Sequence, residues 1–182
     1  ARKPEDVQTG LWFPVHDAPT ERLTSETFVT VVEPLAVVSN GVLVAVTPAG
    51  AGRRTYHHRM DFAHVPYLVS IAVGDWATKS DTWRGKDVTY HVPKDRAADI
   101  DRTFASTPRI LEFLSKETGV EYPYAVYRQV AVSEFTWGGM ENIAATTLND
   151  QTLHDERAHS DWPSDSLVAH EAAHQWFGDY VT

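Results

Sequence analysis

The sequence predicts an α+β fold, in which a strand-rich first half is followed by a half that mixes helices with strands. Before residue 94 the apolar residues alternate or form short runs between glycine and proline, without a 3.6-residue period. After Pro93 apolar residues recur at helical spacing, at Ile100, Phe104, Leu111 and Leu114. We therefore place a domain boundary near Pro93, between a β-rich domain over residues 1–92 and a second domain over residues 93–182.

Strands are expected in five stretches of the first half. In the first, "TSETFVTVVEP", the side chains alternate between two faces up to Pro34. In "LAVVSNGVLVAVTPAG" the pair Asn40-Gly41 separates two apolar runs, which predicts a hairpin. The other three stretches are "RTYHHRMDF", "YLVSIAVGDW" and "KDVTYHVPK".

The second half is expected to begin with one helix over residues 95–118, kinked near Pro108 and ended by Gly119. A strand ("YPYAVYRQVAV"), a glycine-containing loop ("SEFTWGGMEN"), another strand ("IAATTL") and a polar loop follow. Ser164 is placed to cap a last helix, and Asp165 in its first turn favours the positive end of the helix dipole.

The composition argues against several classes of function. The formal net charge is −9 and no run of Lys or Arg is present, so no nucleic-acid partner is expected. The chain has no cysteine, so any bound metal must be held by histidine and carboxylate side chains. No apolar run is long enough to span a bilayer. The compartment stays open, because a cysteine-free chain tolerates both reducing and oxidising surroundings.

The last helix contains His-Glu-Ala-Ala-His, which has the spacing of a zinc-peptidase helix. Positions i and i+4 lie about 40° apart around a helix, so His170 and His174 can reach one ion. Glu171 lies beside that face, where it is well placed to take a proton from a zinc-bound water with a pKa near ~7. Two histidines can also be ordinary surface residues. The apolar flanks instead favour a buried helix, in which such polar groups need a compensating partner, and a metal ion would supply one.

The histidines of a metal site usually donate their second ring nitrogen to a neighbouring acceptor. Asp179 is a candidate acceptor for His174, and an exposed carboxylate at the end of the helix is the alternative.

The combination of "WGGMEN" with "HEAAHQWFGD" resembles the zinc aminopeptidases of the aminopeptidase N type, a gluzincin metallopeptidase family. In that family a Gly-[Ala/Gly]-Met-Glu-Asn loop precedes the His-Glu-x-x-His helix by a few tens of residues. "WFPVHDAP" and "YLVSIAVGDW" resemble two further segments, both in the family's N-terminal β-domain. The resemblance implies that residues 1–92 are the second half of that β-domain. It also implies that residues 93–182 are the first part of a thermolysin-like α+β catalytic domain.

The resemblance assigns the loop a part in substrate binding. Glu141 would bind the α-ammonium of a peptide as a charge-assisted pair. Gly138 and Gly139 would let the main chain approach the substrate closely. Met140 and Asn142 belong to the same substrate-binding loop.

On the helix, the resemblance makes His170 and His174 zinc ligands and Glu171 the general base. The family's third ligand, a glutamate, would lie beyond Thr182, as would the tyrosine that stabilises the tetrahedral intermediate. Residues 1–182 alone are therefore expected to be inactive and to bind zinc weakly, because two imidazoles leave the ion under-coordinated.

These observations favour a zinc-dependent aminopeptidase that removes N-terminal residues from peptides, with one zinc ion per active site. Two alternatives stay open. One is a leukotriene-hydrolase-like enzyme that is both epoxide hydrolase and aminopeptidase, and the other is a non-catalytic interaction module without zinc. The expected partners are peptides with a free N-terminus and the remainder of the same polypeptide.

Overall fold

In the computed structural model, which describes residues 9–181, the first part of the chain forms two antiparallel sheets. One has the strand order β1-β4-β3, with β1 at Leu23–Val32, β3 at Val42–Pro48 and β4 at Arg53–His64. The other pairs β2 (Ala36–Ser39) with β5 (Ile71–Gly74). Two short 3-10 helices accompany these strands, η2 (Thr9–Leu11) and η3 (Pro66–Leu68).

The second part contains a five-stranded mixed sheet with the strand order β6-β7-β8-β10-β9. Its strands are β6 (Trp76–Trp83), β7 (Lys86–Pro93), β8 (Val126–Val132), β9 (Gly139–Met140) and β10 (Ala145–Asn149). The pairs β6–β7 and β9–β10 are antiparallel, whereas β7–β8 and β8–β10 are parallel. β9 is an edge strand, so one side of its main chain faces away from the sheet.

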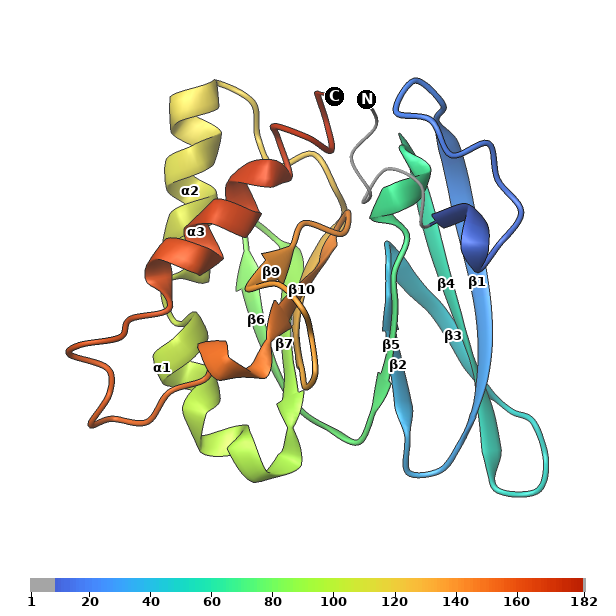
Figure 1. Ribbon diagram of the computed structural model, residues 1–182, viewed down its shortest axis with the longest axis horizontal. Coiled ribbons are helices and arrows are strands. Elements are labelled where there is room, and N and C mark those ends of the chain that lie inside the picture. The colour runs from blue at the N-terminus through green and yellow to red at the C-terminus, as the bar shows by residue number, and fades with distance from the viewer. Residues whose placement is uncertain (1–8, 182) are drawn as a thin grey trace.

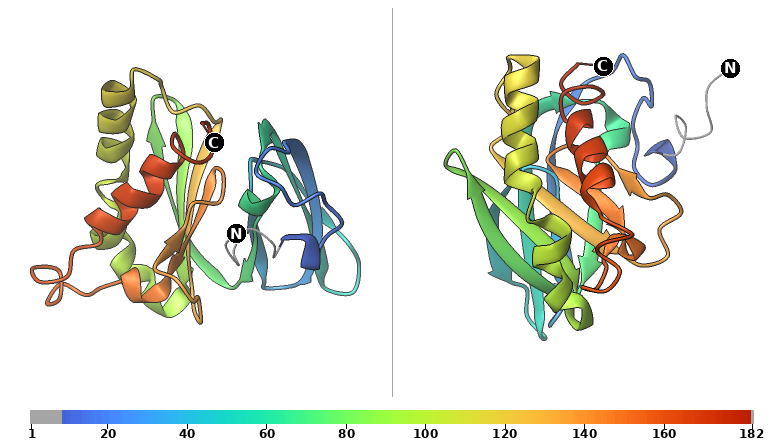
Figure 2. Two further views of the ribbon diagram at one scale, coloured as in Figure 1. Left: turned by 45° about the horizontal axis from the view of Figure 1, so that its top comes forward. Right: turned by 90° about the vertical axis from the view of Figure 1, so that its left-hand side faces the viewer.

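Three α-helices cover one face of this sheet, and the sheets of the first part lie on its other side (Figures 1 and 2). The helical segments are η4 (Lys94–Asp99), α1 (Ile100–Phe104), α2 (Thr107–Thr118), η5 (Asp150–Thr152) and α3 (Asp165–His174). Large buried side chains, including Phe104, Leu111, Tyr127, Val168 and Trp176, form one core with the sheet. This burial holds α2 and α3 against the sheet. None of the helices within residues 9–181 is long and apolar enough to cross a membrane.

The predicted α+β fold class is confirmed. Strands β6 and β7 precede the boundary predicted near Pro93, yet β7 pairs with β8 on the other side of it. The five-stranded sheet therefore includes residues from both predicted domains. The boundary between residues 92 and 93 stays a prediction.

The single helix expected over residues 95–118 is wrong. The segment forms η4, α1 and α2, and α2 begins at Thr107 with Pro108 in its first turn. Proline is tolerated there because the first N–H groups of a helix have no intrahelical partner, whereas in the interior it removes a hydrogen bond. The chain therefore starts a new helix before Pro108. Gly119 ends α2 in the left-handed region with a φ of 68°, as expected.

The hairpin expected at Asn40-Gly41 is also wrong, because β2 and β3 belong to different sheets. Gly41 adopts a left-handed φ of 73°, and a Cβ at this position would lie 2.1 Å from the main-chain oxygen of Arg59. Only glycine meets both demands, so the pair turns the chain from one sheet into the other.

Candidate functional site

Helix α3 carries both histidines of the predicted zinc helix. Its start is attached to α1, because the hydroxyl of Ser164 donates to the main-chain oxygen of Thr103 at 2.6 Å. Ser164 stands at the N-cap position but makes no capping hydrogen bond with its side chain, so the expected side-chain cap is wrong. Asp165 lies in the first turn, as expected.

His170 and His174 converge at the exposed side of α3. Their Nε2 atoms are 3.2 Å apart, and their rings cross at 83°. Nδ1 of His174 donates to the main-chain oxygen of Phe177 at 2.9 Å, which places the proton on Nδ1 and leaves a lone pair on Nε2. Two imidazoles are thus arranged with their Nε2 atoms toward a common point.

This arrangement fits a zinc ion. With zinc–nitrogen bonds of about 2.0–2.1 Å, two nitrogen ligands of a tetrahedral site lie about 3.3 Å apart, close to the observed separation. Within residues 9–181, however, no group of three or more His, Cys, Asp or Glu side chains gathers to hold a metal. The described part of the chain therefore offers two ligands of such a site.

Glu171 points away from solvent and is only 4% exposed. Its Oε2 has no hydrogen-bond partner among the described residues. Burial raises the pKa of Glu171 to about 7, and the charge of Glu141 acts in the same direction, whereas His174 lowers it. A carboxyl group with a pKa near neutrality can both accept and release a proton.

The glycine loop and the zinc helix meet at Gly139. A Cβ built on Gly139 would lie 2.4 Å from Oε1 of Glu171, so the absence of a side chain leaves room for this carboxylate. The main-chain oxygen of Gly138 accepts a hydrogen bond from the N–H of Asn149 at 2.9 Å. Because main-chain groups alternate in direction along a strand, Gly139 presents its own N–H and C=O at the open edge of β9.

Glu141 follows β9 and borders a cavity of about 1000 Å³. Its Oε1 accepts a hydrogen bond from the hydroxyl of Tyr67 at 3.2 Å. The cavity is lined largely by apolar side chains and reaches from η3 and β5 to β9, with Tyr67, Val69, Ile71, Val73 and Met140 among its walls. A carboxylate therefore stands at one side of a mainly apolar space.

Met140 and Asn142 differ in their surroundings. Met140 is half-buried and faces the same cavity. Asn142 is buried, and its Oδ1 accepts from the hydroxyl of Thr147 at 2.8 Å while its amide donates to the main-chain oxygen of Leu68 at 3.4 Å. Asn142 thus connects the loop to β10 and to η3.

Gln175, directly after the zinc helix, joins that helix to the loop. Its amide nitrogen donates to the main-chain oxygen of Glu141 at 3.0 Å, and its Oε1 accepts from the N–H of Ala144 at 2.9 Å. The side chain is fully buried, so both bonds are protected from water. Neither Gln175 nor Tyr67 was identified from the sequence, because their positions carry no spacing pattern that links them to Glu141.

Asp179 does not orient His174, so this expectation is wrong. The Nδ1–H of His174 donates to the main-chain oxygen of Phe177 instead, and neither carboxylate oxygen of Asp179 has a hydrogen-bond partner among the described residues. Burial raises the pKa of Asp179 to about 9, to which the charges of Glu141 and Glu171 contribute. Asp179 is therefore part of an acidic interior behind the site.

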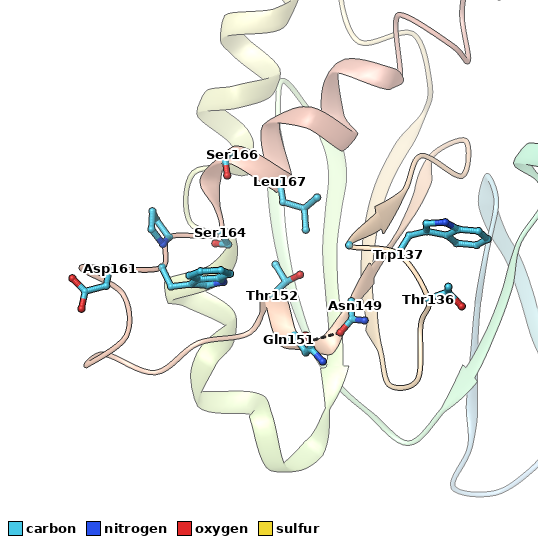
Figure 3. A pocket seen from close by; sticks show the side chains of 12 residues that line it. Thr136, Trp137, Asn149, Gln151, Thr152, Asp161, Ser164, Ser166 and Leu167 are labelled. Atoms are coloured by element: carbon cyan, nitrogen blue, oxygen red, sulfur yellow. Dashed lines mark hydrogen bonds between the residues drawn. The ribbon is translucent and has the colours of Figure 1, made fainter.

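A second cavity, of about 540 Å³, is lined by Trp137 and Gly138. Figure 3 shows Leu167 of α3 above Thr152 of η5 within it, with Asn149 and Gln151 nearby. Trp137 borders both cavities, so they adjoin at the start of β9.

Comparisons with known proteins give similarity to peptidases. Residues 102–182 match the family model described as "Peptidase family M1 domain". The chain is 29% identical to aminopeptidase N of Acetobacter pasteurianus over 179 residues, which cover 93% of this chain and 49% of the relative. It is 27% identical to human endoplasmic reticulum aminopeptidase 1 over 183 residues, covering 98% of this chain and 19% of the relative. "Probable aminopeptidase 2" of Sulfurisphaera tokodaii is 26% identical over 185 residues, covering 98% and 23%. The chain thus spans about half of the first relative and less than a quarter of the other two.

Proposed function

Because residues 102–182 match the peptidase family M1 domain and the similar proteins are aminopeptidases, we propose that the chain belongs to this family and forms part of the active site of a zinc-dependent aminopeptidase, which removes the N-terminal residue of a peptide. The observation that carries the proposal is the close approach of Gly139 to Glu171. It brings a loop with a carboxylate suited to an α-ammonium against a helix with two converging histidines and a buried carboxylate.

His170 and His174 would hold the zinc ion through their Nε2 atoms. A third ligand, expected from the remainder of the polypeptide, would complete the site. When bound, zinc supplies Lewis-acid chemistry, which polarises the carbonyl of the scissile peptide bond and makes an attacking water more acidic.

Glu171 would act as the general base. Its buried carboxylate would take a proton from the attacking water and pass it to the nitrogen that leaves as the new N-terminus. The unpaired Oε2 supports this role, because a buried oxygen without a partner remains available to a water.

Glu141 would recognise the α-ammonium of the substrate, and the adjoining cavity of about 1000 Å³ would take its first side chain. Gly139 would hydrogen-bond to the substrate main chain at the open edge of β9. A peptide held in this way would extend past Gly138, toward the cavity that Leu167 lines.

The proposal is tested with Glu171→Gln and Glu141→Gln in the complete protein, assayed on aminoacyl-anilides. Glu171→Gln should lower kcat by about 10²–10⁴-fold with bound zinc unchanged, because it removes a general base. Glu141→Gln should chiefly raise KM, because it removes the charge that pairs with the ammonium.

Glu134 is exposed and lies at the start of the glycine-containing loop, before Gly138, so it provides a matched control, and Glu134→Gln should have the activity of the unchanged protein. Turnover that stays near the original value in both site variants would contradict the proposal. Absence of bound zinc from the complete protein would favour the non-catalytic interaction module.

A further inference from the structure

We infer that Tyr67 is a positioning residue of the amine site, whose hydroxyl holds the Glu141 carboxylate in the orientation that receives an α-ammonium. This inference rests on the proposed function, since it presumes that Glu141 binds the amine of a substrate. It extends that function by giving the first part of the chain a direct role in recognition.

The contact is made across 74 positions of the chain. Tyr67 lies in η3, between β4 and β5, and its hydroxyl donates to Oε1 of Glu141 at 3.2 Å. A phenol is the donor in a bond to an ionised carboxylate, which can only accept. With Oε1 engaged by the hydroxyl, Oε2 of Glu141 would be the oxygen that receives a second donor such as an ammonium.

The main chain around Tyr67 is held in place from several sides. The buried amide of Asn40 donates to the main-chain oxygens of Leu68 (3.0 Å) and Ile143 (2.8 Å). Its Oδ1 accepts from the N–H of Ser70 at 2.8 Å. These bonds tie η3 to the segment directly after Glu141, so the hydroxyl and the carboxylate keep a fixed relation.

The surroundings of Glu141 create a need for such a donor. Glu141 lies close enough to Glu171 and Asp179 for its charge to raise the pKa of both. A carboxylate beside other acidic groups is stabilised by a charge-assisted hydrogen bond from a neutral donor. Tyr67 supplies this donor without adding a cation that would compete with the substrate.

Tyr67 also borders the large cavity, so a purely structural role of its ring is the competing explanation. Tyr67→Phe separates the two, because it keeps the ring and removes only the hydroxyl. Tyr90 offers a matched control: its hydroxyl donates to Oδ2 of Asp81 at 3.4 Å, in the β6–β7 pair and outside the site.

The experiment uses the complete protein and two inhibitors that differ only in the amine, leucine hydroxamic acid and isocaproic hydroxamic acid. Tyr67→Phe should weaken binding of leucine hydroxamic acid about tenfold, the scale of a hydrogen bond to a charged group. It should leave isocaproic hydroxamic acid binding as tightly as before. KM for aminoacyl-anilides should rise while kcat stays nearly constant, and Tyr90→Phe should change neither inhibitor.

Equal weakening of both inhibitors by Tyr67→Phe would assign it a structural role, and no change in either would remove the hydroxyl from recognition. Both results overturn the inference and leave the proposed function intact, provided that the original protein prefers the amine-bearing inhibitor. If the original protein shows no such preference, the amine site at Glu141 fails and the role of Tyr67 fails with it.

Discussion

Single residues set the distances within the site. Gly139 lets the edge strand approach Glu171, and Gln175 joins the end of the zinc helix to the main chain on both sides of Ile143. Gly41 also allows a close approach, in the first part of the chain, because the turn between β2 and β3 packs directly against the main chain of Arg59. At the two glycines the absence of a side chain allows two segments to pack closely, and at Gln175 the hydrogen bonds of the side chain hold two segments together.

Gly41→Ala should destabilise the protein far more than Gly85→Ala. Both glycines have a left-handed φ, 73° and 78°, so alanine is strained at each. Only Gly41 has a neighbour where the Cβ would stand, the main-chain oxygen of Arg59, while nothing lies within 4 Å at Gly85. We expect a loss of about 1 kcal/mol for Gly85→Ala, and more than about 3 kcal/mol or failure to fold for Gly41→Ala.

Urea unfolding followed by circular dichroism measures both variants. Similar midpoints for the two alanine variants would mean that the close approach at Gly41 contributes nothing beyond backbone strain.

At the scale of elements, the sheets of the first part are joined to the five-stranded sheet through basic side chains, of which one is buried and two are half-buried. His58 on β4 and His91 on β7 are near Arg128 on β8, which donates to the main-chain oxygen of Gly41. Burial, together with the nearby charge of Arg128, lowers the pKa of both histidines to about 4. These elements therefore pack with neutral imidazoles between them.

Stability should fall as the pH is lowered from about 6.5 to about 4. In this window the unfolded chain binds protons at His58 and His91 that the folded chain does not, so protonation favours unfolding. His58→Gln should make the melting temperature less dependent on pH between these values, whatever its effect at neutral pH.

The control is His16→Gln, because the side chain of His16 is 76% exposed and folding leaves it in water. A pH dependence that His58→Gln leaves unchanged would show that the interface does not depend on the neutral form of His58.

At the scale of the whole molecule, the site is built between elements that are distant in sequence. The proposed amine-binding loop and the proposed zinc helix α3 come from the second part, while η3 of the first part supplies Tyr67. Apolar side chains on β3 and β5 stay exposed, among them Val42, Val44, Ile71 and Val73. The described residues thus contain the proposed amine site and the two proposed zinc ligands, and they leave apolar surface uncovered.

Residues 1–182 alone should bind zinc weakly, because two imidazoles leave two positions of a tetrahedral ion to water. Titration calorimetry and metal analysis of this chain and of the complete protein measure the difference. We expect one tightly bound zinc per molecule in the complete protein, and loss of the metal from residues 1–182 on dialysis. Tight, stoichiometric zinc in residues 1–182 would contradict the two-ligand site.

The zinc helix is the part of the site that could be read from the sequence, because the relation of His170 to His174 is local. Four residues of helix bring the two rings together whatever the rest of the chain does. The same holds for Gly119, whose left-handed conformation depends on the end of α2 alone. The hairpin prediction at Asn40-Gly41 failed because the strands on either side of the pair bind to different partners, β2 to β5 and β3 to β4. Those partners lie farther along the chain, so the local sequence does not specify them.

The sequence by itself determined the α+β class and the family resemblance, and it singled out the two segments proposed to form the site, since each depends on local spacing and residue type. Only the tertiary structure decided that Gly139 meets Glu171, that Gln175 and Tyr67 hold Glu141, and that Phe177 rather than Asp179 orients His174. These contacts arise when elements far apart in the chain pack against one sheet, and local patterns carry no record of that packing.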